Sequence, residues 1–571
     1  MADTAARPDM ARSVTHPWER SYPPGVTWDV PIPQRSMVDM FDGAVAKFAT
    51  RPCIDFLDKK YSYAEVGGLV DRIAKGLQDM GVRKGDRVGL FLPNTPYAVL
   101  FFYGILKAGG TVVNFNPLYA EREIEQMIED SETEMMVTLD LKVTFDKLAK
   151  MIGRTRLRTI IACPMAGILP FPKNFLFPLV KRKELADTSV VSAHVKPFKQ
   201  IIANDGRPAS VTVDPVEDVA VLQYTGGTTG VPKGAMLTHG NLYANTMQAA
   251  LWFPDAEEGK ERMLGVLPLF HVFAMTSVMN WPLLKGAEIV LLPRFELDQV
   301  MQTIHKKKPS LFPAVPTIYT AINNHKEREK YDLSSIKFCI SGGAPLPVEV
   351  KAQFEKVTGC KLVEGYGLSE SSPVATVNPV HGTSKPGSIG LPVPGTMIEI
   401  MSLEDRTKPV PQGERGEICI RGPQVMKGYW KRPQETADTL LDGRLHTGDV
   451  GFMDEDGFTF IVDRIKDMIL AGGYNVYPRN VEEALYQHPG VAECIVLGVP
   501  DPYRGQTVKA YVKLRDGYAP TPEELKGFLK DKLSPIEMPK QFEFRDELPK
   551  TMVGKLSRKA LLDELAEKKA G

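Results

Sequence analysis

The sequence predicts an α/β protein with a large N-terminal domain, a β-rich subdomain and a small α+β C-terminal domain. Helical and strand-like segments alternate from Met37 to about Ala162 and again from Val219 to about Met401. This alternation is typical of mostly parallel sheets covered by helices. The length of 571 residues exceeds what one hydrophobic core usually supports. We therefore expect at least two domains.

The first alternating stretch contains four clear elements. Residues 71–82 (DRIAKGLQDMGV) predict a helix that ends at Gly81, and residues 86–94 (DRVGLFLPN) predict a strand stopped by its proline. Residues 97–110 (YAVLFFYGILKAGG) predict a buried helix closed by glycines. The next apolar run, TVVNFNP, predicts another strand.

Three later regions differ in composition and in the pattern of predicted helices and strands. Residues 163–215 are rich in Pro and Lys and resemble an insertion or linker, whereas short strands with glycine turns at 413–462 predict a β-rich subdomain. Beyond Lys466, two helical and two strand-like segments and a charged final helix look like a separate unit. The expected division is an N-terminal extension (1–36), a large domain (37–465, with the β-rich subdomain at about 402–465) and a small domain (466–571).

The composition excludes some function classes. Lys plus Arg equals Asp plus Glu at 70 each, so the basic excess that a nucleic-acid-binding protein needs is missing. The six cysteines show no CxxC spacing, so a zinc site is not expected. Their wide separation fits a reduced interior, and the N-terminus lacks the apolar core of a signal peptide. We expect a cytoplasmic protein.

Two apolar stretches raise the question of a membrane. Met263–Leu284 has no charged residue, but its prolines and polar residues favour a buried strand and helix over a membrane span. Residues 165–182 (MAGILPFPKNFLFPLVKR) are too broken by prolines to span a bilayer. They could lie on the inner face of a membrane as a peripheral contact, or they could be an apolar loop that covers the core.

The most informative motif is YTGGTTGVPKGAMLTH, from Tyr224 to His239. Its glycines allow the backbone N–H groups to face a polyphosphate, its threonine hydroxyls add donors or a magnesium ligand, and Lys233 supplies positive charge. It is not a Walker loop, because Lys233 is followed by Gly234 and a strand-like segment. The alternative is a polar hairpin without a ligand. The expected phosphate-binding residues are Thr225, Gly226, Gly227, Thr228, Thr229, Gly230 and Lys233.

TGGTTGVPKG resembles the signature loop of the adenylate-forming superfamily of acyl-CoA synthetases, peptide-synthetase adenylation domains and beetle luciferases. The resemblance extends over nearly the whole chain from about residue 37. EGYGLSES, KPGSIGLPVPG, GPQVMKGYW, HTGD, DRIKDMILAGGYNVYP and PKTMVGK follow in the same order and are most similar to bacterial long-chain fatty-acyl-CoA synthetases. Several motifs in one order are far more specific than any one of them.

The resemblance assigns roles around ATP. It implies that Glu370 and the hydroxyl of Thr225 bind Mg²⁺, a cation that prefers oxygen ligands. Ser369 stands where the family usually has Thr, which preserves the hydroxyl. Asp449 is expected to accept hydrogen bonds from the ribose, with Arg464 near the ribose and phosphate. The adenine site is expected to consist of Tyr366 with its neighbours Gly365 and Gly367, and of an opposite wall formed by Gly343, Ala344 and Pro345.

The resemblance also assigns roles to the C-terminal part. Lys555 is expected to reach from a mobile small domain and bridge the acyl carboxylate and the α-phosphate. Lys466 matches the hinge about which that domain rotates, and Gly472 and Gly473 would flank the pantetheine tunnel of CoA. His271 is expected to border the carboxylate end of the acyl pocket, although a purely structural histidine is the alternative.

These roles imply a two-step fatty-acid–CoA ligase that uses ATP, Mg²⁺ and CoA. The segment around His271 is apolar and offers no Asp or Arg to an amino group or second carboxylate, so an alkyl substrate is the default. A long chain is what the resemblance implies. Medium-chain, dicarboxylic and aromatic acids stay open, as does a homodimer. Other readings are a carrier-loading adenylation domain, a luciferase-like oxygenase, a conventional NTPase and a non-catalytic nucleotide or acyl sensor.

Overall fold

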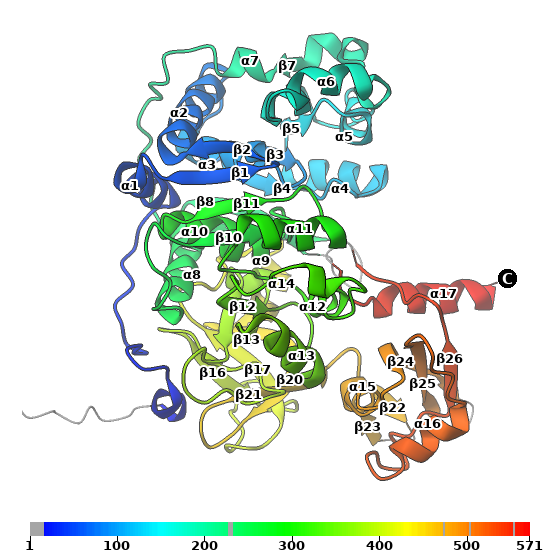
Figure 1. The fold of residues 1–571 in the computed structure, drawn as a ribbon. Coiled ribbons are helices and arrows are strands. Elements are labelled where there is room, and N and C mark those ends of the chain that lie inside the picture. Colours follow the sequence, from blue (N-terminus) through cyan, green and yellow to red (C-terminus); the bar gives the residue numbers. More distant parts are fainter. Residues whose placement is uncertain (1–15, 226–231, 472–473, 502–503, 552–553, 571) are drawn as a thin grey trace, which may run out of the picture.

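The protein folds into a large lobe and a small lobe, as shown by the computed structural model in Figure 1. The structure describes residues 16–225, 232–471, 474–501, 504–551 and 554–570. In Figure 1 the small lobe (orange) lies at the lower right, and the C-terminal helix α17 (Arg558–Ala570) extends to the right between the two lobes.

The central sheet of the large lobe confirms the predicted α/β class. Its strands β8, β4, β3, β5, β6 and β7 pair in parallel, and β9 pairs antiparallel with both β8 and β18. In spatial order the strands are β18 (Gly428–Tyr429), β9 (Lys233–Thr238), β8 (Val219–Thr225), β4 (Thr111–Asn114), β3 (Arg87–Phe91), β5 (Met135–Leu139), β6 (Thr159–Cys163) and β7 (Val195–Pro197).

Two further sheets complete the α/β part. Parallel single-residue bridges at Leu311 join them, from Met263 on one side to Phe338 on the other. The first contains β10 (Arg262–Gly265), β11 (Glu288–Leu291), β1 (Pro52–Phe56) and β2 (Lys59–Ser62), and the second contains β12 (Phe338–Ser341), β13 (Lys361–Gly367), β14 (Val374–Val377) and β15 (Leu391–Pro392).

Helices cover these sheets, and one large apolar core extends between them. Helix α2 shows why the sequence forms it here: the Ser62 hydroxyl caps its first turn and Glu65 completes a capping box. The helices of the large lobe are α1 (Met37–Phe48), α2 (Tyr63–Asp79), α3 (Pro96–Ala108), α4 (Glu121–Ser131), α5 (Lys142–Ala149), α6 (Lys173–Val180), α7 (Phe198–Ile201), α8 (His239–Trp252), α9 (Val272–Ala274), α10 (Trp281–Leu284), α11 (Leu297–Lys307), α12 (Pro316–Asn323), α13 (Val348–Thr358) and α14 (Pro433–Thr439).

The β-rich subdomain and the small lobe each have their own sheet. The subdomain contains β16 (Met397–Met401), β17 (Gly416–Arg421), β19 (Leu440–Leu441), β20 (Arg444–Met453) and β21 (Thr459–Arg464). The small lobe contains β22 (Ile469–Ala471), β23 (Tyr474–Val476), β24 (Val491–Asp501), β25 (Gly505–Leu514) and β26 (Gln541–Phe544), with α15 (Pro478–Tyr486) and α16 (Pro522–Leu529) packed on it. Because the small lobe has a separate apolar core, the two lobes can move as units.

One prediction about the fold is wrong in part. Residues 163–215 are not simply an irregular insertion, because Val195–Pro197 forms β7, which pairs in parallel with β6 at the edge of the central sheet. The three-residue strand is too short to produce a recognisable period in the sequence. The stretch Met263–Leu284 is a buried strand followed by helical turns, as predicted. No helix in the described ranges has the length and apolar character to cross a bilayer.

The first described segment, residues 16–36, runs along one side of the large lobe (Figure 1, dark blue). The Trp28 indole N–H donates to the Thr396 carbonyl (2.7 Å), and Gly395 N donates to the Trp28 carbonyl (2.8 Å). The Tyr22 ring meets Trp252 of α8 edge-on, with 5.1 Å between ring centroids. The segment therefore ties α8 to the entry of the β-rich subdomain.

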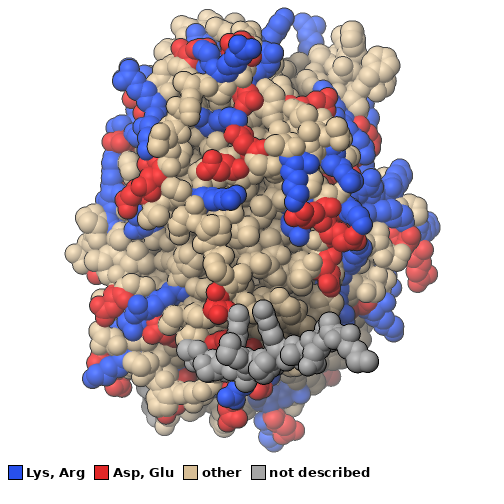
Figure 2. Space-filling model, turned by 90° about the vertical axis from the view of Figure 1, so that its left-hand side faces the viewer, with Lys and Arg blue, Asp and Glu red and all other residues tan. Residues whose placement is uncertain are grey.

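Figure 2 shows the face on this side of the molecule. Lysine and arginine side chains are interspersed with acidic ones around a broad uncharged centre. This pattern agrees with the equal numbers of basic and acidic residues in the sequence. The face therefore does not carry the basic field that attracts a polyanion.

Candidate active site

A cleft of about 1620 Å³ lies between the two lobes and brings most of the predicted site residues together. Among its lining residues are Thr225, His271, Gly343, Ala344, Pro345, Gly365, Tyr366, Gly367, Glu370, Asp449, Arg464, Lys466 and Lys555. These positions are spread over more than half the chain, so it is the fold that collects them. The predicted residues Gly226, Gly227, Thr228, Thr229, Gly230, Gly472 and Gly473 lie outside the described residues.

The two ends of the phosphate loop are held by a strand pair. Thr225 ends β8 and faces Lys233, the first residue of the antiparallel strand β9. The Thr225 hydroxyl donates to the Lys233 carbonyl at 3.4 Å, and the Lys233 ammonium lies 5.2 Å from the centre of the Tyr429 ring. Lys233 is not among the cleft-lining residues.

Glu370 lies in a short 3-10 helix, Ser369–Ser371, directly after β13. Its Oε1 atom accepts a hydrogen bond from the Tyr429 hydroxyl at 2.7 Å. The Glu370 carboxylate and the Thr225 hydroxyl line the same cleft, and both are the hard oxygen donors that Mg²⁺ prefers. The donor set therefore fits a magnesium ion that bridges protein and phosphates. Sequence reasoning missed Tyr429, although it lies in the motif GPQVMKGYW.

Tyr366, Asp449 and Arg464 form a connected group that lines the cleft. The Tyr366 hydroxyl donates to Asp449 Oδ2 (2.6 Å), and Arg464 Nε contacts Asp449 Oδ1 (3.0 Å). Asp449 and Arg464 are direct cross-strand partners on β20 and β21. Burial, followed by the charge of Asp449, raises the pKa of Tyr366. The phenol therefore stays a donor and fixes the Asp449 carboxylate.

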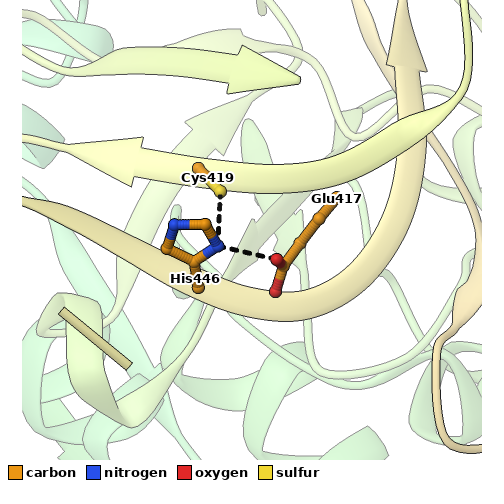
Figure 3. Close-up of side chains that lie close together, drawn as sticks. All are labelled: Glu417, Cys419 and His446. Atoms are coloured by element: carbon orange, nitrogen blue, oxygen red, sulfur yellow. Dashed lines mark hydrogen bonds and ion pairs between the residues drawn. The ribbon is translucent and has the colours of Figure 1, made fainter. Parts of the chain in front are cut away.

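Behind Asp449 lies a buried cluster of Glu417, Cys419 and His446 (Figure 3). Glu417 Oε2 is 2.6 Å from His446 Nδ1, and the Cys419 sulfur is 3.3 Å from the same nitrogen. Zinc with bonds of about 2.0–2.3 Å would hold its ligand atoms more than about 3 Å apart, so the shorter separation is a hydrogen bond. Glu417 also accepts from Gly448 N at 3.0 Å. The cluster thereby supports the turn that leads to Asp449.

Lys555 enters the cleft from the small lobe and contacts the turn at Gly343. Gly343 has a φ of +85°, and a Cβ placed there would overlap the Cε atom of Lys555. Burial, with a further contribution from the Arg464 charge, lowers the pKa of Lys555 to about 8. Among the described residues, no carboxylate pairs with the partly buried Lys555 ammonium. Such an ammonium suits a negatively charged ligand.

His271 caps the short helix α9, and its Nδ1 accepts from Phe273 N at 3.2 Å. Burial, with a smaller contribution from Lys555, lowers the pKa of His271 to about 3. The imidazole is therefore neutral at physiological pH. Phe270, Val272 and Phe273 line the cleft beside it, so this end of the cleft is apolar.

The connection between the lobes passes through Lys466. It follows Arg464 at the end of β21 and precedes β22 of the small lobe. Burial, followed by the nearby charge of Arg464, lowers the pKa of Lys466. Just beyond it, Arg558 bonds Asp467 (3.3 Å) and Glu482 (2.6 Å). Arg558 was missed by sequence reasoning, because its partners are distant in the chain.

Comparisons with known proteins identify the class. A sequence model of the AMP-binding enzyme family matches residues 41–430, and one of the AMP-binding enzyme C-terminal domain matches residues 480–555. The chain therefore belongs to the AMP-binding enzyme family.

The individual relatives are more specific. A long-chain-fatty-acid–CoA ligase of Bacillus subtilis (strain 168) is 48% identical over 553 residues, covering 96% of this chain and 98% of the relative. Among solved structures, an anthranilate CoA ligase, AuaEII, in complex with anthranoyl-AMP has a TM-score of 0.83 at 26% identity, covering 95% of this chain and 99% of that chain. ATP-bound MatB from Rhodopseudomonas palustris has a TM-score of 0.80 at 27% identity, covering 93% of this chain and 99% of that chain.

Proposed function

We propose that this protein is an AMP-forming long-chain-fatty-acid–CoA ligase. It converts the acid and ATP to acyl-AMP and pyrophosphate, and then converts acyl-AMP and CoA to acyl-CoA and AMP. The observation that carries the proposal is the placement of Lys555, from the small lobe, in a cleft that also contains Glu370 and Asp449. The 48% identity to a long-chain-fatty-acid–CoA ligase supports this substrate class.

The first step joins two anions. An oxygen of the fatty acid carboxylate bonds to the α-phosphorus of ATP, the bond to the bridging oxygen breaks, and pyrophosphate leaves. The reaction needs no protein nucleophile; it needs alignment and charge neutralisation. Lys555 supplies a buried cation between the carboxylate and the α-phosphate. Its desolvated position makes this interaction stronger than it would be in water.

The nucleotide is held by residues of the large lobe. Adenine lies between Tyr366 and the turn at Ala344 and Pro345, and the ribose hydroxyls donate to Asp449. Thr225–Gly230 and Lys233 contact the phosphates. Glu370 and Thr225 are the residues that would hold Mg²⁺, and the ion would supply charge neutralisation for the departing pyrophosphate. Tyr429 keeps Glu370 aimed at the phosphates through the 2.7 Å hydrogen bond.

The second step needs a different arrangement of the lobes. The CoA thiolate attacks the acyl carbon, and AMP leaves with the bonding electrons. Rotation of the small domain (466–571) relative to the large domain (37–465) about Lys466 withdraws Lys555, and Gly472 and Gly473 then flank the pantetheine tunnel. The separate core of the small lobe supports such a rigid rotation.

The acyl group lies at the apolar end of the cleft. Phe270, Val272 and Phe273 line it, and the neutral His271 offers no cation to a second carboxylate. A long alkyl chain is therefore favoured, at about 0.8 kcal/mol per buried methylene. Dicarboxylic acids are disfavoured by this lining.

A turnover assay tests the function. The enzyme is incubated with ATP, Mg²⁺ and a panel of fatty, dicarboxylic and aromatic acids, with and without CoA. We expect AMP and pyrophosphate to appear in a manner that depends on the acid, with CoA consumption highest for long alkyl chains. Release of ADP, or AMP release that does not depend on the acid, would overturn the proposal.

The pH dependence of the first step follows from Lys555. Because its pKa is lowered to about 8, the fraction carrying the cation falls as pH rises through 8. kcat/KM for pyrophosphate release without CoA, which reports the free enzyme, should fall above about pH 8. Lys555→Arg stays charged over this pH range. We expect it to react more slowly than the wild type, but its kcat/KM should not fall above about pH 8. A wild-type profile that stays flat to about pH 10 would contradict the cation role.

Residues 165–182 form a peripheral contact with the membrane. The side chains of α6 are all at least partly exposed, and Phe171, Phe175 and Leu179 are 83%, 75% and 74% exposed. Such a concentration of exposed apolar side chains marks an interaction site. Lys173 and Arg182 add positive charge suited to anionic headgroups. The homodimer stays a prediction, because a single chain is described.

The double change Phe175→Asp with Leu179→Asp should abolish this contact. We expect binding to vesicles of mixed neutral and anionic lipids to fall at least about tenfold, because apolar burial is lost and like charge is added. Val216→Asp, at a site 53% exposed elsewhere on the large lobe, serves as the control. Sedimentation with vesicles measures the binding, and equal binding of all three proteins would contradict the assignment.

A further inference from the structure

The turn that carries Lys555 is joined to the large lobe by a side-chain hydrogen bond. The Thr317 hydroxyl, in the first turn of α12, donates to the Gly554 carbonyl at 2.9 Å. Gly554 belongs to the small lobe, and its carbonyl is part of the peptide group that leads into Lys555. The bond therefore acts on the backbone directly next to the residue that enters the cleft.

The described residues of the Lys555 turn also bond to one another. Gly554 N donates to the Thr551 carbonyl (2.8 Å), and Lys555 N donates to the Thr551 hydroxyl (3.2 Å). These bonds fix the shape of the turn but do not fix its position on the large lobe. The Thr317 hydroxyl helps to fix the position of the turn on the large lobe, because it is bonded to the Gly554 carbonyl.

Gly554 also allows the close approach to α12. It has a φ of +81°, and a Cβ at this position would lie 3.3 Å from the Thr317 hydroxyl and 3.4 Å from Val315. The turn is thus seated directly against the start of α12. A second contact between the lobes, from Arg479 N to Asp463 Oδ2 (2.9 Å), involves a residue close to the Lys466 hinge. It can therefore constrain the small lobe near the hinge but not at the far end that carries Lys555.

We propose that Thr317 is a positioning residue that holds the small lobe in the arrangement for adenylate formation. The proposal rests on the two-step function proposed above. Rotation of the small lobe for thioester formation must break this bond, because it moves Lys555 out of the cleft. Thr317 therefore favours the first half-reaction and contributes nothing to the second.

The test measures the two half-reactions separately in Thr317→Val. Loss of one hydrogen bond should reduce the population of the closed arrangement, and hence the single-turnover rate of acyl-adenylate formation, about five- to tenfold. Thioester formation from supplied acyl-AMP and CoA should be unchanged or slightly faster. Thr317→Ser keeps the hydroxyl and should restore adenylation.

Thr320→Val is the matched control. Thr320 lies one turn further along α12, and its hydroxyl donates to the Pro316 carbonyl of the same helix at 3.0 Å. This variant removes a hydroxyl from α12 without removing a bond to the small lobe, so both half-reactions should keep the wild-type rate. A drop in adenylation equal to that of Thr317→Val would show that a change in α12 itself is responsible, and would overturn the proposal.

A distance measurement provides a readout independent of chemistry. All six natural cysteines are buried, so cysteines introduced at the exposed positions Gln353 (α13) and Glu523 (α16) can be labelled selectively. The two labels form a fluorescence energy-transfer pair, whose efficiency reports the distance between α13 and α16. With ATP bound, the population with the transfer efficiency of the adenylation arrangement should be smaller in Thr317→Val than in the parent.

The outcomes separate the two proposals. Wild-type adenylation and wild-type energy transfer in Thr317→Val would overturn the positioning role while leaving the ligase function intact. Absence of AMP formation in the parent protein would overturn the ligase function itself. Equal slowing of both half-reactions would also contradict the positioning role, because it would indicate general damage.

Discussion

Lys555→Ala is expected to reduce the rate of acyl-adenylate formation about a thousandfold. The side chain lies in the cleft against Gly343, and the proposed function assigns it the neutralisation of charge that develops on the α-phosphate. Removing one such group from a preorganised site typically costs a factor of about 10²–10³. Thioester formation from supplied acyl-AMP should be largely spared, because the lysine is withdrawn in that step. Rapid-quench measurement of each half-reaction gives both rates.

Lys550→Ala is the control for this variant. Lys550 belongs to the same motif, PKTMVGK, but its ammonium pairs with Glu493 at 2.6 Å within the small lobe. It should keep both half-reactions within about twofold, since Lys550 is not among the residues that line the cleft. If Lys555→Ala slowed both half-reactions to the same extent, the assigned role would be wrong.

Gly343→Ala should slow adenylate formation about a hundredfold. A Cβ at this position would occupy the space of the Lys555 side chain, and the φ of +85° is unfavourable for any residue with a Cβ. The lysine could then no longer reach its place, although its charge and the rest of the small lobe would be unchanged. Thioester formation from acyl-AMP should be much less affected.

Gly359→Ala separates backbone strain from the loss of space. Gly359 has a φ of +77°, but a Cβ there would meet open space. It should therefore lower stability by about 1 kcal/mol and leave the adenylation rate unchanged. The change in melting temperature reports the strain and quenched-flow kinetics report the rate. Comparable adenylation rates for Gly343→Ala and the parent protein would show that Lys555 does not need the space beside Gly343.

Local patterns were sufficient to predict much of the fold. The helix expected at 97–110 is α3 (Pro96–Ala108), and the strand expected at 86–94 is β3 (Arg87–Phe91). Boundaries moved by a few residues: the helix expected to end at Gly81 ends at Asp79 and begins earlier, at Tyr63. The spatial order of the strands could not be predicted, because it depends on packing between segments far apart in the sequence.

The motifs predicted the residues of the candidate site, but they did not predict the neighbouring residues that hold them in place. Tyr429 acts on Glu370, and Glu417 acts on the turn before Asp449, through contacts between different elements. Glu417 has no distinctive local pattern, and the motif that contains Tyr429, GPQVMKGYW, does not indicate its contact with Glu370. A motif marks which residues matter together, but only the folded chain shows which neighbour holds each one in place. The depth of the acyl site is set in the same way and is not encoded in any single segment.

The segment from His16 to Ser36 precedes both family matches, which begin at residues 41 and 480, yet it supports the subdomain that contributes Asp449 to the cleft. It links α8 to the strands that continue into the β-rich subdomain, where Asp449 lies. A shortened chain that starts at Met37 would keep every proposed site residue. It would nevertheless lose the brace formed by Trp28 on Gly395 and Thr396, and so loosen the β-rich subdomain that carries Asp449.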